Sequence, residues 1–175
     1  MTGLLEDAPR PTKRRTKRVR GDDFALQEFL PYRLSVLAHQ VSRSLAEVYG
    51  ERYGLTIAQW RIIANLGRAG AMTAGVLAER SNLDKPKVTR ALKSLIARGL
   101  ASRTAVKGDR RQARIALTAR GRAVFRAVGR LALAWERELC ASLDPATLRC
   151  FDGAIDELTA RARQLAARHG KGPGQ

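Results

Sequence analysis

Hydrophobic residues recur every three or four positions along most of this chain, a spacing that places them on one face of an α-helix. The first series begins after Phe24 and stops at Gly50 and Gly54, and its members are Leu30, Leu34, Leu37, Val41, Leu45 and Val48. Two further series follow Thr118, namely Val124, Val128, Leu131, Trp135 and Leu139, then Leu148, Phe151, Ile155, Leu158 and Leu165. The pattern predicts one long helix on the N-terminal side and two on the C-terminal side, with a break at Asp144-Pro145 between the last two.

A shorter helix with a clear start signal lies between these long ones. Thr56 is followed three residues later by Gln59, the capping-box spacing in which each side chain satisfies a backbone donor at the start of a helix. We expect this helix over residues 57–66, because Gly67 and Gly70 then break the apolar series.

Two more short helices have their own caps. Thr73 caps a third helix that reaches Glu79. Asp84 caps a fourth, which has Pro86 in its first turn and ends at Gly99.

The connection between the third and fourth helices has the pattern of a helix-turn-helix. Ala78 is small enough for the point where two helices cross. Asn82 stands four residues later, where the turn requires a left-handed backbone that Asn tolerates better than most residues. The apolar residues that would lock the two helices together are Leu77, Leu83, Val88 and Leu92.

A β-hairpin is predicted after the fourth helix. Residues 100–106 and 112–117 partly alternate between apolar and polar side chains, and Gly108-Asp109 suits the tip. We therefore expect a mostly α protein with a small β-hairpin wing, a winged helix-turn-helix flanked by helices at both ends.

The positive charge of the chain is concentrated in two segments. The whole chain has 33 Lys and Arg against 16 Asp and Glu, a net charge of +17. Residues 84–114 carry a net +8 and residues 1–20 a net +5. A folded protein with this charge implies a polyanionic partner, and a basic helix after a matching turn favours double-stranded DNA.

The predicted DNA contacts lie on the capped helices and the hairpin. A helix of this kind fits the major groove, where Lys and Arg read guanine and Thr meets a base edge or a thymine methyl group, whereas an arginine at the wing tip enters the minor groove. The expected DNA-binding residues are Thr73, Lys85, Lys87, Thr89, Arg90, Lys93, Lys107, Asp109, Arg110 and Arg111. Lys93 and Arg98 are expected to hold phosphates, and Asp109 to orient Arg111 by a local ion pair.

These residues resemble the MarR family of bacterial transcription regulators. The resemblance extends from Phe24 to about Arg168, and its most specific part is Asp109-Arg110-Arg111 followed by Leu117-Thr118. Further matching segments are Leu77–Arg80, Leu83–Arg90 and Arg98–Leu100.

The resemblance implies an obligate homodimer that binds a palindromic operator, with the first helix and the last two helices of each copy interdigitated. The apolar helices at both ends independently favour a symmetric dimer, which would bury them. We expect a basic tail over 1–21, disordered, an N-terminal dimerisation helix over 22–55 and a winged DNA-binding domain over 56–118. Dimerisation helices over 119–170 and a flexible end over 171–175 follow.

Members of the family usually bind effectors between the dimerisation helices and the winged domain, often aromatic acids, phenolic compounds or coenzyme A thioesters. By position, the ligand pocket here draws on Tyr32, Arg33, His39, Arg43 and Trp60. Ordinary packing explains the histidine and the tryptophan equally well. Arg33 and Arg43 could instead pair with Glu136 or Glu138 across a dimer.

Other function classes fit less well. The chain has no run of about 18 apolar residues, no secretory leader, no P-loop, no GxGxxG and no metal-spaced cluster, so we expect a cytoplasmic, nucleoid-associated protein that is neither an enzyme nor membrane-bound. It is expected to need no cofactor apart from its small-molecule effector. Cys140 and Cys150 keep a thiol-based sensor open, although the thiol sensors of the family usually carry a cysteine near the first helix.

The leading hypothesis is a ligand-relieved, sequence-specific repressor of a catabolic or efflux operon. The alternative is a non-specific nucleoid-associated protein, for which the basic tail and high charge would be sufficient.

Overall fold

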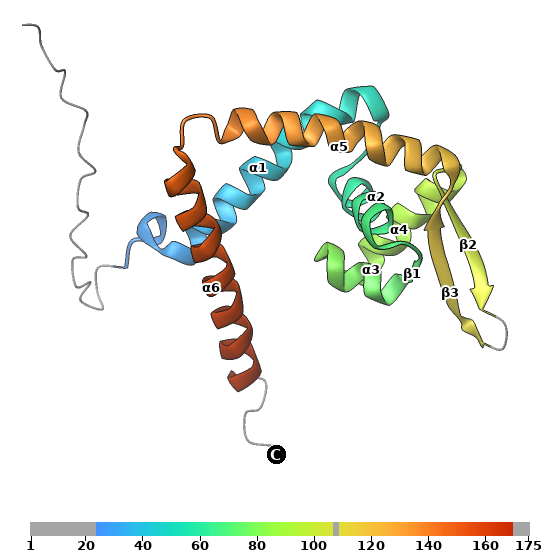
Figure 1. Ribbon diagram of the computed structural model, residues 1–175. Coiled ribbons are helices and arrows are strands. Elements are labelled where there is room, and N and C mark those ends of the chain that lie inside the picture. The colour runs from blue at the N-terminus through green and yellow to red at the C-terminus, as the bar shows by residue number, and fades with distance from the viewer. Residues whose placement is uncertain (1–23, 107–108, 170–175) are drawn as a thin grey trace, which may run out of the picture. The chain divides into compact units, whose positions relative to one another are not determined.

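The computed structural model describes residues 24–106 and 109–169, without the side chains of residues 106–112 and 169. The predicted basic tail and the flexible C-terminal end therefore lie outside the described residues. The chain forms two compact units, residues 1–40 and 41–175. In chain order its elements are η1 (Leu26–Glu28), α1 (Leu30–Tyr53), α2 (Ile57–Ala69), β1 (Met72–Thr73), α3 (Ala74–Ser81), α4 (Lys85–Ala97), β2 (Ala101–Val106), β3 (Asp109–Leu117), α5 (Ala119–Leu139) and α6 (Pro145–His169) (Figure 1).

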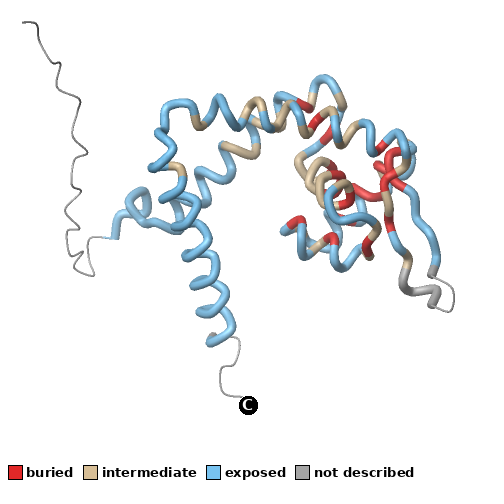
Figure 2. Tube along the Cα trace, in the orientation of Figure 1, coloured by how far each residue is buried: buried red, intermediate tan, exposed pale blue. Residues whose placement is uncertain are grey.

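The second unit is built around α2. Its buried residues come from every element between the end of α1 and the first half of α5, and they include Tyr49, Ile62, Ile63, Leu66, Leu77, Val88, Leu95, Leu100, Ile115, Leu117 and Val128. Figure 2 shows these buried positions gathered in the winged part, whereas α6 is exposed from residue 149 to residue 168. The predicted mostly helical fold with a small β wing is confirmed.

The helix caps follow the sequence signals closely. Thr56 and Gln59 form the reciprocal capping box, with the Thr56 N–H donating to Gln59 Oε1 at 2.9 Å and the Gln59 N–H to Thr56 Oγ1 at 3.3 Å. The Thr73 and Asp84 side chains likewise cap α3 and α4. Each cap satisfies a backbone donor that the first turn of a helix leaves free, so these starts are fixed locally.

Two helix ends differ from the prediction. Gly50 lies inside α1 rather than at its end, and α2 continues through Gly67 to Ala69. A side chain at Gly67 would collide with the ring of Phe125 on α5. Glycine here provides space for a neighbouring helix, and it does not end the helix.

The wing is a three-stranded antiparallel sheet with the order β1-β3-β2. The hairpin of β2 and β3 is as predicted, although β3 begins at Asp109 rather than at residue 112. The two-residue strand β1 is an addition, and it pairs Met72 with Ile115 and Thr73 with Arg114. It fixes the base of the wing to the start of α3.

Among the described residues, no helix is both long and apolar enough to cross a membrane. The same residues contain no group of His, Cys, Asp and Glu arranged to hold a metal ion.

Candidate nucleic-acid interface

The turn between α3 and α4 has the geometry that its sequence predicts. Asn82 adopts φ 50° and ψ 53°, the one non-glycine residue with positive φ among those described. The Asn82 N–H donates to Glu79 O at 3.1 Å, and the Leu83 N–H donates to Ala78 O at 3.0 Å. These two bonds close the end of α3 and set the direction in which α4 begins.

The α4 helix has one apolar and one basic face. Val88, Ala91, Leu92 and Leu95 are buried against the rest of the winged unit. The exposed residues on the other side are Lys85, Lys87, Thr89, Arg90 and Lys93. A polar contact also holds the helix, since Gln59 Nε2 of α2 donates to Ser94 Oγ at 2.8 Å. The basic face is therefore presented on a helix fixed by the core.

The first turn of α4 contains an ion pair that constrains one predicted base reader. Asp84 Oδ1 accepts from the Lys87 N–H at 2.7 Å, and Asp84 Oδ2 lies 2.8 Å from Lys87 Nζ. The side-chain hydrogen bond from Lys87 holds the pKa of Asp84 below its usual value, so the cap is ionised at neutral pH. Lys87 must leave this carboxylate before it can reach a base.

Thr89 has one of its bonding options occupied. Its Oγ1 hydroxyl donates to the Lys85 carbonyl at 2.9 Å. The hydroxyl lone pairs and the methyl group stay free, and these suit an amino group of adenine or cytosine, or the methyl group of thymine. Lys85, Arg90 and Lys93 have no carboxylate partner within the part of the chain that the structure describes.

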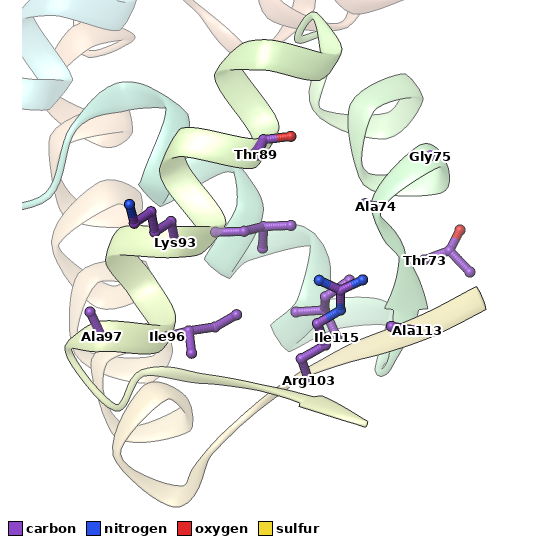
Figure 3. A pocket seen from close by; sticks show the side chains of 11 residues that line it. Thr73, Ala74, Gly75, Thr89, Lys93, Ile96, Ala97, Arg103, Ala113 and Ile115 are labelled. Atoms are coloured by element: carbon purple, nitrogen blue, oxygen red, sulfur yellow. The ribbon is translucent and has the colours of Figure 1, made fainter. Parts of the chain in front are cut away.

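A groove of about 840 Å³ runs between α4, the start of α3 and the sheet. Its lining includes Thr89 and Lys93 from α4, Thr73 and Gly75 at the start of α3, and Arg103 from β2. Figure 3 shows Arg103 extending into the groove, whereas the Thr73 side chain turns away from α4. Arg103 was not among the predicted contacts. Arg103 pairs with Ile115 across the hairpin, so its side chain lies on the side of the sheet that faces α4. The sequence alone does not give this register.

The tip of the wing can be placed only in part. Asp109, Arg110 and Arg111 belong to β3, and the strand pairing becomes irregular between Ala105 and Val106. Their side chains, and all of Lys107, lie outside the described residues. The predicted contacts of these four residues with DNA therefore stay predictions.

Arg98, which is expected to hold a phosphate, has its guanidinium bonded to backbone carbonyls in this structure, and its contact with DNA stays a prediction. Its half-buried guanidinium donates to Tyr53 O at 2.6 Å and to Gly54 O at 2.9 Å. These are carbonyls at the C-terminal end of α1, where backbone acceptors lack helical partners and a cation is favoured. Arg98 thus joins the end of α4 to the end of α1.

The predicted ligand residues are distributed over both units. Tyr32, Arg33 and His39 are exposed in the first unit, and Arg43 is exposed in the second. Trp60 is half-buried, with its ring centroid 5.8 Å from that of Tyr49 and 6.5 Å from that of Phe125. These ring contacts agree with the alternative that Trp60 serves ordinary packing. The ligand pocket itself stays a prediction.

Sequence reasoning missed Arg61, a half-buried cation in the second unit. Arg61 Nη2 donates to Ser42 Oγ at 3.3 Å and its Nη1 to Ser81 O at 3.5 Å, so it links α1 to the end of α3. Burial raises the pKa of the neighbouring Tyr49 hydroxyl, and the charge of Arg61 acts in the opposite direction. The position of Arg61 among the apolar residues of α2 does not indicate that its side chain connects α1 to α3.

Comparisons with known proteins agree with this geometry. A family model described as MarR family matches residues 53–112. A MarR family transcriptional regulator from Silicibacter pomeroyi is 26% identical, with 77% of this chain and 89% of that chain covered and a TM-score of 0.67. A MarR/EmrR family regulator from Acinetobacter sp. ADP1 is 20% identical, with 81% and 99% covered and a TM-score of 0.73.

A third similar structure is BpsR from Bordetella bronchiseptica, 20% identical, with 73% of this chain and 98% of that chain covered and a TM-score of 0.63. The DNA binding of BpsR is regulated by 6-hydroxynicotinic acid.

Proposed function

We propose that this chain is a MarR-family transcriptional regulator rather than an enzyme, and that it binds a palindromic operator as a homodimer and releases it when a small ligand binds. The observation that carries the proposal is the exposed basic face of α4, held by the Asn82 turn and by the Asp84 cap. Its site of action is the bacterial cytoplasm, where the DNA lies.

The recognition helix α4 enters the major groove, and the hairpin of β2 and β3 reaches the adjacent minor groove. Arg90 and Lys85 are the free cations best suited to base edges, because Lys87 is paired with Asp84. Lys93 and Arg103 line the groove between helix and wing, and we assign them to the phosphate backbone that separates the two DNA grooves.

A homodimer is supported by apolar surface that a single chain leaves exposed. In the second unit this surface lies on the end of α5 and along α6, and it comprises Leu139, Phe151, Ile155, Leu158 and Leu165. In the first unit the exposed apolar residues of α1 are Leu30, Leu34, Val36 and Leu37. A soluble monomer rarely exposes this much contiguous apolar surface, and a two-fold partner would bury it. Two-fold symmetry also matches a palindromic operator.

The ligand dependence is supported by the fold that the chain shares with BpsR. An aromatic acid or an acyl-CoA thioester would suit the two arginines of the predicted pocket, Arg33 and Arg43. A second candidate site is the groove lined by Thr89, Lys93 and Arg103. An anion bound there would pair with Lys93 and Arg103, which we assign to the DNA backbone, so it would compete with the operator directly. A thermal-shift screen would detect either site, because a ligand at 100 times its Kd stabilises the fold by about 2.7 kcal/mol.

Operator specificity is the decisive test of the proposed function. The affinity for DNA upstream of the regulated genes is compared with that for a random duplex of equal length at physiological salt. A specific regulator should prefer its operator by about 10³-fold or more. A ratio near one would instead support the nucleoid-associated alternative. Repression is then tested by transcription from the same fragment, with and without the ligands that raise the melting temperature.

A further inference from the structure

A row of arginines follows one side of α5, outside the groove and the basic face of α4. Arg122, Arg126 and Arg130 are four residues apart, and Arg137 continues the row two turns later. At 3.6 residues per turn these four side chains fall within about 80° of the helix circumference. All four are exposed. Leu133, which lies between Arg130 and Arg137 in the same row, is 58% exposed.

No acidic side chain of α5 stands at the spacing that would pair it with an arginine of the row. No Asp or Glu stands three or four residues before or after any of its four members. Within the described ranges the one ion pair is that of Asp84 with Lys87, far from α5 in sequence. Like charges four residues apart destabilise a helix. A helix that carries two such pairs in succession is thus suited to an external polyanion.

The row faces away from the core of the winged unit. Val128, which is fully buried, lies about 160° around the helix from the centre of the row. Figure 1 shows α5 passing α2 on the side opposite to α3, whereas the groove lies between α4, α3 and the sheet. Arg122 marks the end of the row at the wing, because its Nη1 donates to Leu117 O at 2.8 Å. A straight duplex that contacts α4 and the wing therefore leaves the row free.

We propose that the α5 arginine row binds the phosphate backbone of a second DNA segment, so that a dimer seated on its operator can hold another duplex. Guanidinium groups favour phosphate because their planar fork donates two parallel hydrogen bonds. Arg122, Arg126 and Arg130 rise by about 6 Å from one to the next along the α5 axis, and Arg137 follows Arg130 after about 10 Å. These spacings are close to the axial rise of two and of three phosphates of one DNA strand, at about 3.4 Å each. Contacts of this kind depend on charge and carry no base preference.

The test is a bridging experiment with the full chain. Biotinylated operator on beads is saturated with the protein, and capture of a fluorescent random duplex is measured over a range of salt concentrations. The variant is R126Q/R130Q/R137Q, in which Arg122 is kept because of its bond to Leu117 O. The matched control is R149Q/R163Q/R168Q on α6, which removes the same charge from exposed positions that form no row. Light scattering establishes the oligomeric state of each protein.

The row variant should bind operator as the unchanged protein does and capture the second duplex much more weakly. The slope of log capture against log salt should fall by about 3, since each lost phosphate contact removes about 0.9. The α6 control should retain capture.

Three results would overturn the proposal. Equal loss in the α6 control would mean that overall charge, rather than the row, holds the second duplex. A row variant that no longer forms the dimer, or no longer binds operator, would assign the arginines to the interface between copies or to the operator itself. Polyglutamate that displaces the second duplex as effectively as unlabelled DNA does would point to an acidic polypeptide partner. The proposal rests on operator binding, and failure of that binding in the unchanged protein would be seen before the second duplex is added.

Discussion

Arg98 and Arg90 provide the sharpest contrast between a structural and a DNA-binding arginine, although the sequence places both on one basic helix. The perturbation is the same for each, a change to glutamine. Arg98 donates to Tyr53 O and Gly54 O, whereas Arg90 is exposed and makes no ion pair with any described residue. We expect R98Q to lower stability and R90Q to lower operator affinity.

The magnitudes follow from the contacts. A hydrogen bond to a charged group contributes about 1.5–3 kcal/mol when buried, and one of the two bonds of Arg98 is solvent-exposed, so we expect R98Q to cost about 2 kcal/mol in the free energy of unfolding. For a chain of this length that corresponds to a decrease in Tm of about 4–8 °C. R90Q should leave Tm unchanged and weaken operator binding by about 1–3 kcal/mol.

The assays are urea unfolding and the salt dependence of operator binding, both measured on the two variants and the unchanged protein. If R98Q kept its unfolding free energy and reduced the log–log salt slope by about 1, Arg98 would be a phosphate contact and our interpretation of its carbonyl bonds would be wrong.

Three further changes have distinct expected outcomes. Arg111→Ala should weaken operator binding by about 1–3 kcal/mol with the dimer intact, as measured by fluorescence anisotropy, and unchanged affinity would mean that the wing does not touch DNA. Gly121→Ala should destabilise the protein by at least about 1–3 kcal/mol in urea unfolding, because its Cβ would overlap the Leu100 carbonyl, whereas Gly153→Ala in open space on α6 should be neutral or stabilising. The cap of Asp84 has a lowered pKa, so its contribution should be complete above the ordinary value of 3.8 and be lost as pH falls through the folded-state value. The stability difference between the unchanged protein and an Asp84→Asn variant should therefore vanish in acid, and a difference that grows on acidification would contradict this assignment.

The parts of the fold that the sequence predicts are those with local causes. The Thr56 box, the Asp84 cap and the Asn82 turn each depend on residues within four positions, and all three form as expected. The strand β1 has only two residues and exists because β3, about 40 residues later, pairs with it. The continuation of α2 through Gly67 depends on Phe125, which is even farther along the chain. No local pattern contains these partners.

The same distinction applies to the interface. The basic face of α4 could be predicted because helical periodicity alone separates it from the buried face. The roles of individual cations could not be predicted, since Lys87 is paired within its own turn and Arg98 depends on carbonyls 44 and 45 residues away.

Arginine serves two purposes in this protein, and the net charge of +17 therefore overstates its DNA-binding surface. Among the residues that the structure describes, five arginines donate to backbone carbonyls outside their own helix or strand, namely Arg61, Arg98, Arg114, Arg120 and Arg122. Carbonyls at the ends of helices and strands lack backbone donors, and a long cationic side chain can reach them while its charge stays partly hydrated. Arg114 shows the consequence for function. It lies on β3 within the basic segment, yet its Nη2 donates to Ala71 O at 2.7 Å and so holds the base of the wing to the loop before β1. The winged unit should accordingly contact fewer phosphates than it has basic residues. Some of its arginines hold helices and strands in place, and only the remaining cations are available to DNA.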